Sequence, residues 1–212
     1  MLQENCSDQP MVKIPKLNCD VEIKGTPTKG TPATLGEFWS WAYSDIMCNV
    51  TRSVFGEYLV SRALDKIDNP RDVWRSFDIC YRGKRLEIKT SAFRQGWTQK
   101  KDKNTMSFDI RKRQFFWDPE LGEQVDMKEL RRIPHCYIFC AYVETDKEDA
   151  KKISSILDVS KWEFHPISTV SIDRLFKDQK NLALSVIRKY REGRPSGYSD
   201  LQAQIDIELD IS

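Results

Sequence analysis

The chain has few of the features that mark membrane, secreted or zinc-binding proteins. No apolar run approaches the roughly 18–20 residues that a membrane-spanning helix needs, and the first residues show no basic start followed by an apolar stretch, so no secretory signal is expected. Only two histidines occur among the 212 residues, and no two of the six cysteines have Cys-x-x-Cys spacing. We therefore expect no structural zinc site and no membrane partner. We expect a cytoplasmic protein whose cysteines are reduced thiols.

The net charge is also small, because 34 basic residues are balanced by 32 acidic ones. The charges are unevenly spread, however. Residues 71–132 hold 16 Lys or Arg and 10 Asp or Glu, whereas residues 196–212 hold four acids and no base. The near-neutral total therefore combines a basic middle with an acidic C-terminal segment.

Three segments are expected along the chain. Residues 1–33 repeat the turn-rich sequence Lys-Gly-Thr-Pro, which predicts a flexible N-terminal arm. The sequence pattern over residues 34–193 predicts a single folded domain. This domain begins where Thr34 and Glu37 have the spacing of a helix capping box. Residues 194–212 predict a frayed acidic C-terminal tail.

Helical and strand patterns follow one another inside the predicted domain. Residues 49–66 form a helix pattern with apolar side chains on most sides, which is typical of a buried helix. Two strand patterns follow at residues 76–81 and 84–90, and the apolar run at 136–143 predicts a central strand buried on both faces. The expected fold class is α/β (α+β), with a mixed central β-sheet flanked by helices.

The two strand patterns at 76–81 and 84–90 predict a hairpin whose charged side chains could form a catalytic site. If Arg82 and Gly83 form a two-residue turn, Asp78 lies directly opposite Glu87 and on the same face as Lys89. Like charges directly opposite each other destabilise a sheet, and their Cβ atoms are about 5 Å apart. Two carboxylates at that spacing suit Mg²⁺, and a nearby ammonium group completes a set that fits phosphate-ester hydrolysis. The alternative is a solvent-facing polar side, with an ion pair of Glu87 to Arg85 or Lys89.

Glu57 lies within the apolar belt of the predicted helix at residues 49–66. An isolated buried carboxylate is costly unless it is paired or linked to a metal ion. The alternative to a metal-linked role is an ion pair with an arginine such as Arg52. An inward helix acid followed by an acid–hairpin–acid-x-Lys unit favours the metal-linked interpretation.

On Glu57, Asp78 and the run Glu87-Ile88-Lys89, the sequence resembles the PD-(D/E)xK nuclease superfamily, over about residues 49–143. This superfamily includes restriction endonucleases and Holliday-junction resolvases, so the resemblance implies a restriction endonuclease-like fold. It implies Mg²⁺, with Mn²⁺ as a substitute, bound by Asp78, Glu87 and the backbone carbonyl of Ile88. It also implies that Lys89 acts on the attacking water and that Glu57 binds a second metal ion or a metal-bound water.

The sequence departs from the family pattern in two ways. Phe77 precedes Asp78, where proline is common in the family, and the spacing between the two acids is short. Asp72, which follows Pro70-Arg71, is a rival for the role of first metal acid. Some members of the superfamily have lost activity, although this chain keeps all four candidate groups.

The resemblance implies a metal-dependent DNA endonuclease, a hydrolase that leaves 5′-phosphates, with a restriction-like or repair-like role and DNA as partner. A homodimer would suit double-strand cleavage by one site per chain. The alternatives are a non-catalytic DNA-binding protein on the same fold and a structural or protein-interaction α/β domain. The candidate DNA contacts are the basic and amide residues beyond the hairpin, namely Arg94, Gln95, Gln99, Lys100, Lys101, Lys103, Arg111, Lys112 and Arg113.

Overall fold

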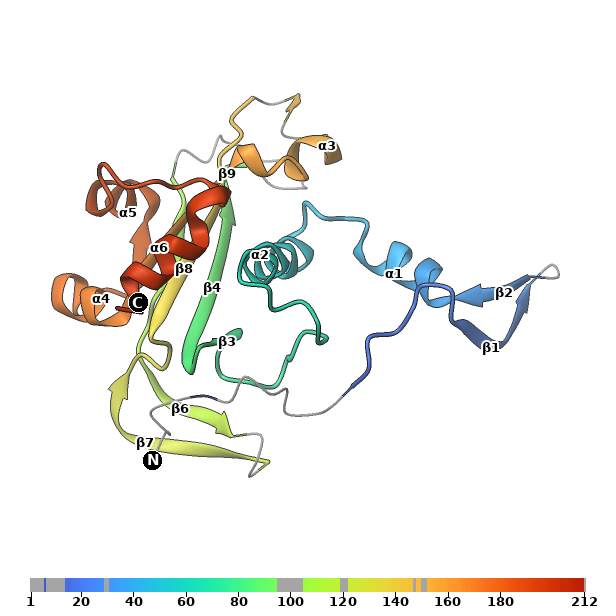
Figure 1. Cartoon of the computed structure of the whole chain (residues 1–212), viewed down its shortest axis with the longest axis horizontal. Coiled ribbons are helices and arrows are strands. Elements are labelled where there is room, and N and C mark those ends of the chain that lie inside the picture. The colour runs from blue at the N-terminus through green and yellow to red at the C-terminus, as the bar shows by residue number, and fades with distance from the viewer. Residues whose placement is uncertain are drawn as a thin grey trace.

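The computed structural model describes residue 6 and residues 14–28, 31–94, 105–118, 122–146, 148–149 and 152–211. Five of the candidate DNA contacts lie outside the described residues: Gln95, Gln99, Lys100, Lys101 and Lys103. The described residues form a mixed α+β structure with several sheets (Figure 1).

A four-stranded mixed sheet forms the centre of the molecule, in the order β3-β4-β8-β9. Strands β3 (Ile79–Tyr81) and β4 (Lys84–Ala92) are antiparallel, β4 and β8 (Cys136–Tyr142) are parallel, and β9 (Trp162–Ser168) is antiparallel to β8. All seven residues of β8 are buried. The continuous apolar run therefore marks a central strand, as the sequence predicts.

Helices cover both faces of this sheet (Figure 1). Helix α2 (Asn49–Ala63) and helix α6 (Leu201–Glu208) contribute to the core on one face, which includes Val60, Leu86 and Ile205. The opposite face is covered by four elements: α4 (Thr169–Phe176), α5 (Leu184–Tyr190), β5 (Ser107–Asp109) and β10 (Asn181–Ala183).

The N-terminal segment differs from the expected flexible arm. Strands β1 (Glu22–Thr28) and β2 (Thr31–Thr34) pair in an antiparallel hairpin, so residues 1–33 are not a structureless arm throughout. Helix α1 (Leu35–Tyr43) follows, and its capping box of Thr34 and Glu37 is confirmed. The hairpin and α1 extend away from the central sheet (Figure 1).

The predicted frayed tail at residues 194–212 is wrong. A short 3₁₀ helix, η3 (Tyr198–Asp200), leads into α6, in which Leu201 and Ile205 are buried in the core. The spacing of four residues places these two side chains on one helical face. The acid Glu208 of this helix accepts hydrogen bonds from the Ser168 backbone and from Arg194.

The remaining described elements lie outside the central sheet. Strands β6 (Arg113–Asp118) and β7 (Glu123–Arg131) form a separate antiparallel hairpin. A short helix, α3 (Ile153–Ile156), and a 3₁₀ helix, η2 (Val159–Lys161), precede β9. Within the described residues, no helix combines the length and apolar character that a membrane crossing requires.

The expectation that all six cysteines are reduced is wrong in this structure. Cys6 and Cys80 form a disulfide across a sequence separation of 74 residues. The Cys6 amide also donates a hydrogen bond of 3.0 Å to the Gly83 carbonyl, which fixes this residue beside the β3–β4 turn. The spacing of the cysteines in the sequence does not indicate this disulfide, because only the fold brings Cys6 to the hairpin. Cys136 and Cys140 are free and buried.

Candidate active site

The β3–β4 hairpin has the predicted register. Arg82 and Gly83 form the turn with φ angles of 48° and 78°, the left-handed conformation that two-residue hairpin turns of this type require at both positions. Ile79 pairs with Leu86, and the Asp78 amide donates a hydrogen bond of 2.9 Å to the Leu86 carbonyl. Asp78 therefore sits immediately before β3, at the end of the ladder and level with Glu87.

The charges of the other three candidate catalytic residues act on the Asp78 carboxyl group. Burial is the largest influence on its pKa, and the charges of Glu87 and Glu57 act in the same direction, which raises the pKa to about 8. A hydrogen bond of 2.6 Å from the Ile88 backbone amide and the charge of Lys89 oppose the rise. The fold therefore brings Glu57, Asp78, Glu87 and Lys89 within electrostatic reach of one another.

Glu57 comes to this place because α2 packs very closely on β4. A Cβ atom added at Gly56 would lie well inside van der Waals contact with the Thr90 hydroxyl, so glycine permits the close approach. The Glu57 side chain is only 12% exposed and forms a bidentate ion pair with Arg71. The alternative partner Arg52 is instead buried and donates to the Met47 carbonyl at 2.7 Å.

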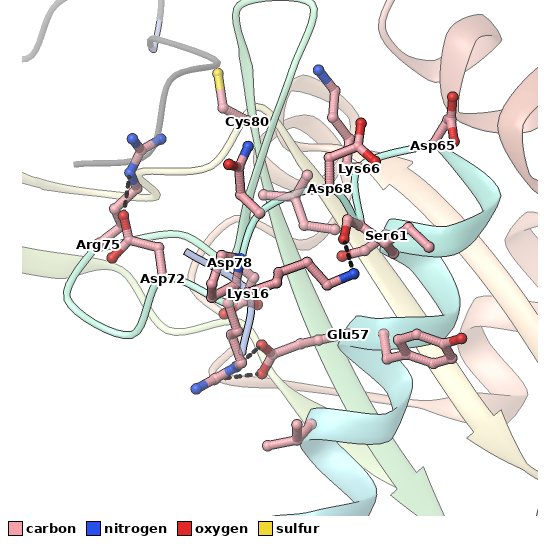
Figure 2. A pocket seen from close by; sticks show the side chains of 17 residues that line it. Lys16, Glu57, Ser61, Asp65, Lys66, Asp68, Asp72, Arg75, Asp78 and Cys80 are labelled. Carbon is pink, nitrogen blue, oxygen red and sulfur yellow. Dashed lines mark hydrogen bonds and ion pairs between the residues drawn. The ribbon is translucent and has the colours of Figure 1, made fainter. Parts of the chain in front are cut away.

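A cavity of about 440 Å³ opens between α2 and the segment that leads to β3. In Figure 2, Glu57 projects from α2 into this cavity toward the segment that carries Asp78. Lys16, from the N-terminal segment, also lines it and donates a hydrogen bond of 2.9 Å to the Ile67 carbonyl. The cavity therefore gives access to two of the candidate acids from the α2 side.

The rival acid Asp72 lines the same cavity. Its carboxylate lies 3.0 Å from the Arg75 guanidinium (Figure 2) and accepts a hydrogen bond of 3.2 Å from the Trp74 amide. Asp78, in contrast, is held by the backbone of the strand that carries Glu87 and Lys89. The geometry thus favours Asp78 over Asp72 as the partner of Glu87.

Glu87 and Lys89 line a second, smaller cavity of about 30 Å³. The Lys89 ammonium group donates a hydrogen bond to the Glu87 carboxylate, as the ion-pair alternative anticipates. Asp78 lines the larger cavity, whereas Glu87 and Lys89 line the smaller one. Asp78 is nevertheless tied to the strand of the smaller cavity, because its carboxylate accepts a hydrogen bond from the amide of Ile88, which lies between Glu87 and Lys89.

The carboxylates can supply part of a Mg²⁺ site. Within the described ranges, no three His, Cys, Asp or Glu side chains are gathered closely enough to hold a metal ion by themselves. Mg²⁺, however, is commonly bound by one or two carboxylates, with water and substrate phosphate completing the shell. Asp78 and Glu87 fit this pattern as hard oxygen donors, and the charge that Glu87 and Glu57 place on Asp78 is the kind that a cation relieves.

Two of the described candidate DNA contacts lie at the smaller cavity. Arg111 and Arg113 line it, and both are within ion-pair distance of Asp109. The other two are held elsewhere: Arg94 donates to the Thr145 carbonyl at 3.2 Å, and Lys112 lies 3.2 Å from Asp178. Of the four candidate contacts that the structure describes, Arg111 and Arg113 therefore lie at the cavity that Glu87 and Lys89 line.

The sequence interpretation missed three residues of these cavities. Arg71 neutralises Glu57, Asp109 holds Arg111 and Arg113, and Tyr137 lies beside Glu87 in the β4–β8 register. Burial raises the pKa of Tyr137, and the Glu87 charge adds to that rise. Tyr137 belongs to the apolar run of β8, and its position beside Glu87 follows only from the pairing of β4 with β8.

Comparisons with protein-family models, with curated proteins and with solved structures found no match to this chain. The interpretation of the site therefore depends on the sequence resemblance and on the geometry described above.

Proposed function

We propose that this protein is a Mg²⁺-dependent DNA endonuclease of the PD-(D/E)xK type, with a restriction endonuclease-like core. The observation that carries the proposal is the Asp78 carboxyl group, held by the Ile88 amide and under the charges of Glu57, Glu87 and Lys89. A cluster of acids beside a lysine at the edge of a sheet is costly for a purely structural role. It suits the binding of a cation and a phosphodiester.

Asp78, Glu87 and the Ile88 carbonyl would hold Mg²⁺, with Glu57 binding a second ion or a metal-bound water. When bound, the metal lowers the pKa of water and polarises a phosphoryl oxygen. Glu57 must exchange its Arg71 partner to take part, and Arg71 is then available to a phosphate oxygen. Lys89 orients the attacking water or stabilises the charge that develops on the phosphate.

Arg111 and Arg113 would contact the phosphates beside the cleaved bond. Both side chains are more than half exposed, at 58% and 56%, so a nucleic-acid strand can reach them. Their contribution is electrostatic and weakens as salt rises. Recognition of a particular DNA sequence would therefore come from residues other than Arg111 and Arg113.

The direct test is cleavage of supercoiled plasmid DNA with Mg²⁺ or Mn²⁺. Lys89→Ala and Asp78→Ala should each lower the cleavage rate at least about 100-fold, and Asp72→Ala should leave most of it. Lys84→Ala, on the same strand but at the turn, is the matched control and should cleave as the unmodified protein does. Undiminished cleavage by both Lys89→Ala and Asp78→Ala would rule out the assigned site.

One observation favours the alternative of a non-catalytic DNA-binding protein. Two of the acids already have cationic partners, Glu57 with Arg71 and Glu87 with Lys89. DNA binding without cleavage in either metal would support that alternative. Absence of DNA binding, together with no thermal shift on addition of Mg²⁺ or Mn²⁺, would instead indicate a structural or protein-interaction domain. Sedimentation with and without DNA would test for the proposed homodimer.

A further inference from the structure

Tyr137 occupies a position that its role in the core does not explain. It lies opposite Glu87 in the parallel pairing of β4 with β8, so both side chains are on the same face of the sheet. Its ring stacks on Phe139 with a centroid distance of 6.0 Å, which fixes its direction. The charges that act on its hydroxyl are those of Glu87, Arg132, Arg113 and Asp109.

Most of these charged residues line the 30 Å³ cavity, and Tyr137 lines it too. Tyr137 therefore lies between this cavity and the core cluster to which it belongs. Among the described residues, no group donates to or accepts from the Tyr137 hydroxyl. A second tyrosine of the same strand behaves differently, because the Tyr142 hydroxyl is 2.7 Å from the Ser155 hydroxyl. A phenylalanine would fill the Tyr137 site equally well if packing were its only purpose.

The cavity has the size and polarity to hold a single water molecule. A space of roughly 10–15 Å³ or more is enough for one water if two to four polar groups surround it. The cavity measures about 30 Å³, and Glu87, Lys89 and Tyr137 all line it. A water molecule in this cavity lies beside Lys89. In the proposed function, Lys89 orients the attacking water.

We propose that this cavity seats the attacking water and that the Tyr137 hydroxyl, together with Lys89, orients it by a hydrogen bond. The inference rests on the proposed nuclease function. The water oxygen forms the new bond to phosphorus, and the bond from phosphorus to the 3′ oxygen breaks with its electron pair on that oxygen. The water gives up one proton to solvent, the 3′ oxygen takes one up, and Tyr137 keeps its own. The products are a 5′-phosphate and a 3′-hydroxyl.

The test compares Tyr137→Phe with Tyr142→Phe in the full-length protein. Single-turnover cleavage of plasmid DNA in Mg²⁺ gives the rate of the chemical step, and DNA binding in Ca²⁺ gives the affinity. Tyr137→Phe should slow cleavage about 10- to 100-fold, the effect of one lost hydrogen bond to a reacting group. Its DNA affinity should stay within about twofold. Tyr142→Phe loses its bond to Ser155 and should cleave at the unmodified rate.

Each other outcome overturns the inference in a distinct way. Equal cleavage by Tyr137→Phe and the unmodified protein removes the role of the hydroxyl and leaves the proposed function intact. An equal loss of rate in Tyr142→Phe, or a loss of DNA affinity in Tyr137→Phe that accounts for the slower cleavage, assigns a structural role to the strand. No cleavage by the unmodified protein in either Mg²⁺ or Mn²⁺ overturns both the inference and the proposed function.

Discussion

Single charged residues in this protein owe their behaviour to the partners that the fold gives them. Asp78 and Glu163 are both partly buried acids, yet their pKa values move in opposite directions. Burial and two neighbouring acids raise the pKa of Asp78 to about 8. For Glu163 burial also acts to raise the pKa, but hydrogen bonds from His165 and Arg188 outweigh it and lower the pKa to about 2. The sign thus depends on whether the nearest charges are like or opposite.

Glu163 makes the stability of the protein depend on acid pH. Since its pKa is lower in the folded than in the unfolded state, its contribution is present above about 4.5 and is lost as the pH falls toward about 2. That contribution is at most about 3 kcal/mol. Arg188→Met should reduce the free energy of unfolding at pH 7, and the difference from the unmodified protein should shrink as the pH falls through this window.

Urea unfolding at pH 7, 4.5 and 3 measures this dependence. Arg174→Met, which removes an exposed arginine from α4, is the matched control and should have little effect at any pH. A stability difference between Arg188→Met and the unmodified protein that stays constant across the pH range would contradict the assignment.

At the scale of elements, the contact between α2 and β4 is the critical one, because it carries Glu57 to the hairpin. The helix can approach this closely because Gly56 faces Thr90. Glycine inside a helix is ordinarily unfavourable by about 1 kcal/mol relative to alanine. Its presence here indicates that close packing outweighs helix propensity at this point.

Gly56→Ala should therefore destabilise the protein, by about 1–3 kcal/mol of unfolding free energy, despite the better helix propensity of alanine. It should also reduce the proposed cleavage activity, because Glu57 is the next residue. Gly197→Ala is the control, since among the described residues an added Cβ there meets the Asp200 carboxylate alone, at 4.0 Å. Chemical denaturation measures both effects, and a more stable Gly56→Ala protein would refute the close packing.

At the scale of the whole molecule, both ends of the described chain return to the central sheet. The disulfide attaches Cys6 to β3. Helix α6 places Leu201 and Ile205 in the same core as α2. The buried arginine Arg191 strengthens this closure by donating to the Pro166 carbonyl at 2.6 Å and to Gln204 at 2.8 Å. The acidic C-terminal segment is thus part of the fold.

Two isoleucines of α6 test this closure directly. Ile205 is fully buried, whereas Ile207 is 63% exposed. Ile205→Ala should lower the free energy of unfolding by about 2–5 kcal/mol, and Ile207→Ala should change it by less than about 0.5 kcal/mol. Thermal or urea unfolding separates the two variants. Equal and small effects of both would mean that the C-terminal helix does not dock.

Local and near-neighbour features could be predicted from the sequence. The capping box at Thr34 and the register around the Arg82–Gly83 turn depend on residues a few positions apart. The buried strand β8 follows from a continuous apolar run. Helix α2 begins at Asn49, where the predicted helix pattern at residues 49–66 begins, and ends at Ala63. Short-range spacing carries this information because the backbone geometry of turns, caps and strands is itself local.

Long-range pairing depends on the tertiary structure. The residue types alone supply four candidate catalytic groups and a hairpin that carries three of them, Asp78, Glu87 and Lys89. Which arginine meets Glu57, which cysteine meets Cys80, and which tyrosine meets Glu87 depended on the packing of α2 and β8 against β4. Such contacts join residues far apart in the chain, and the periodicity of apolar residues in the sequence does not indicate them. The acidic tail became a docked helix for the same reason: its two buried side chains are recognisable only once the core that receives them exists.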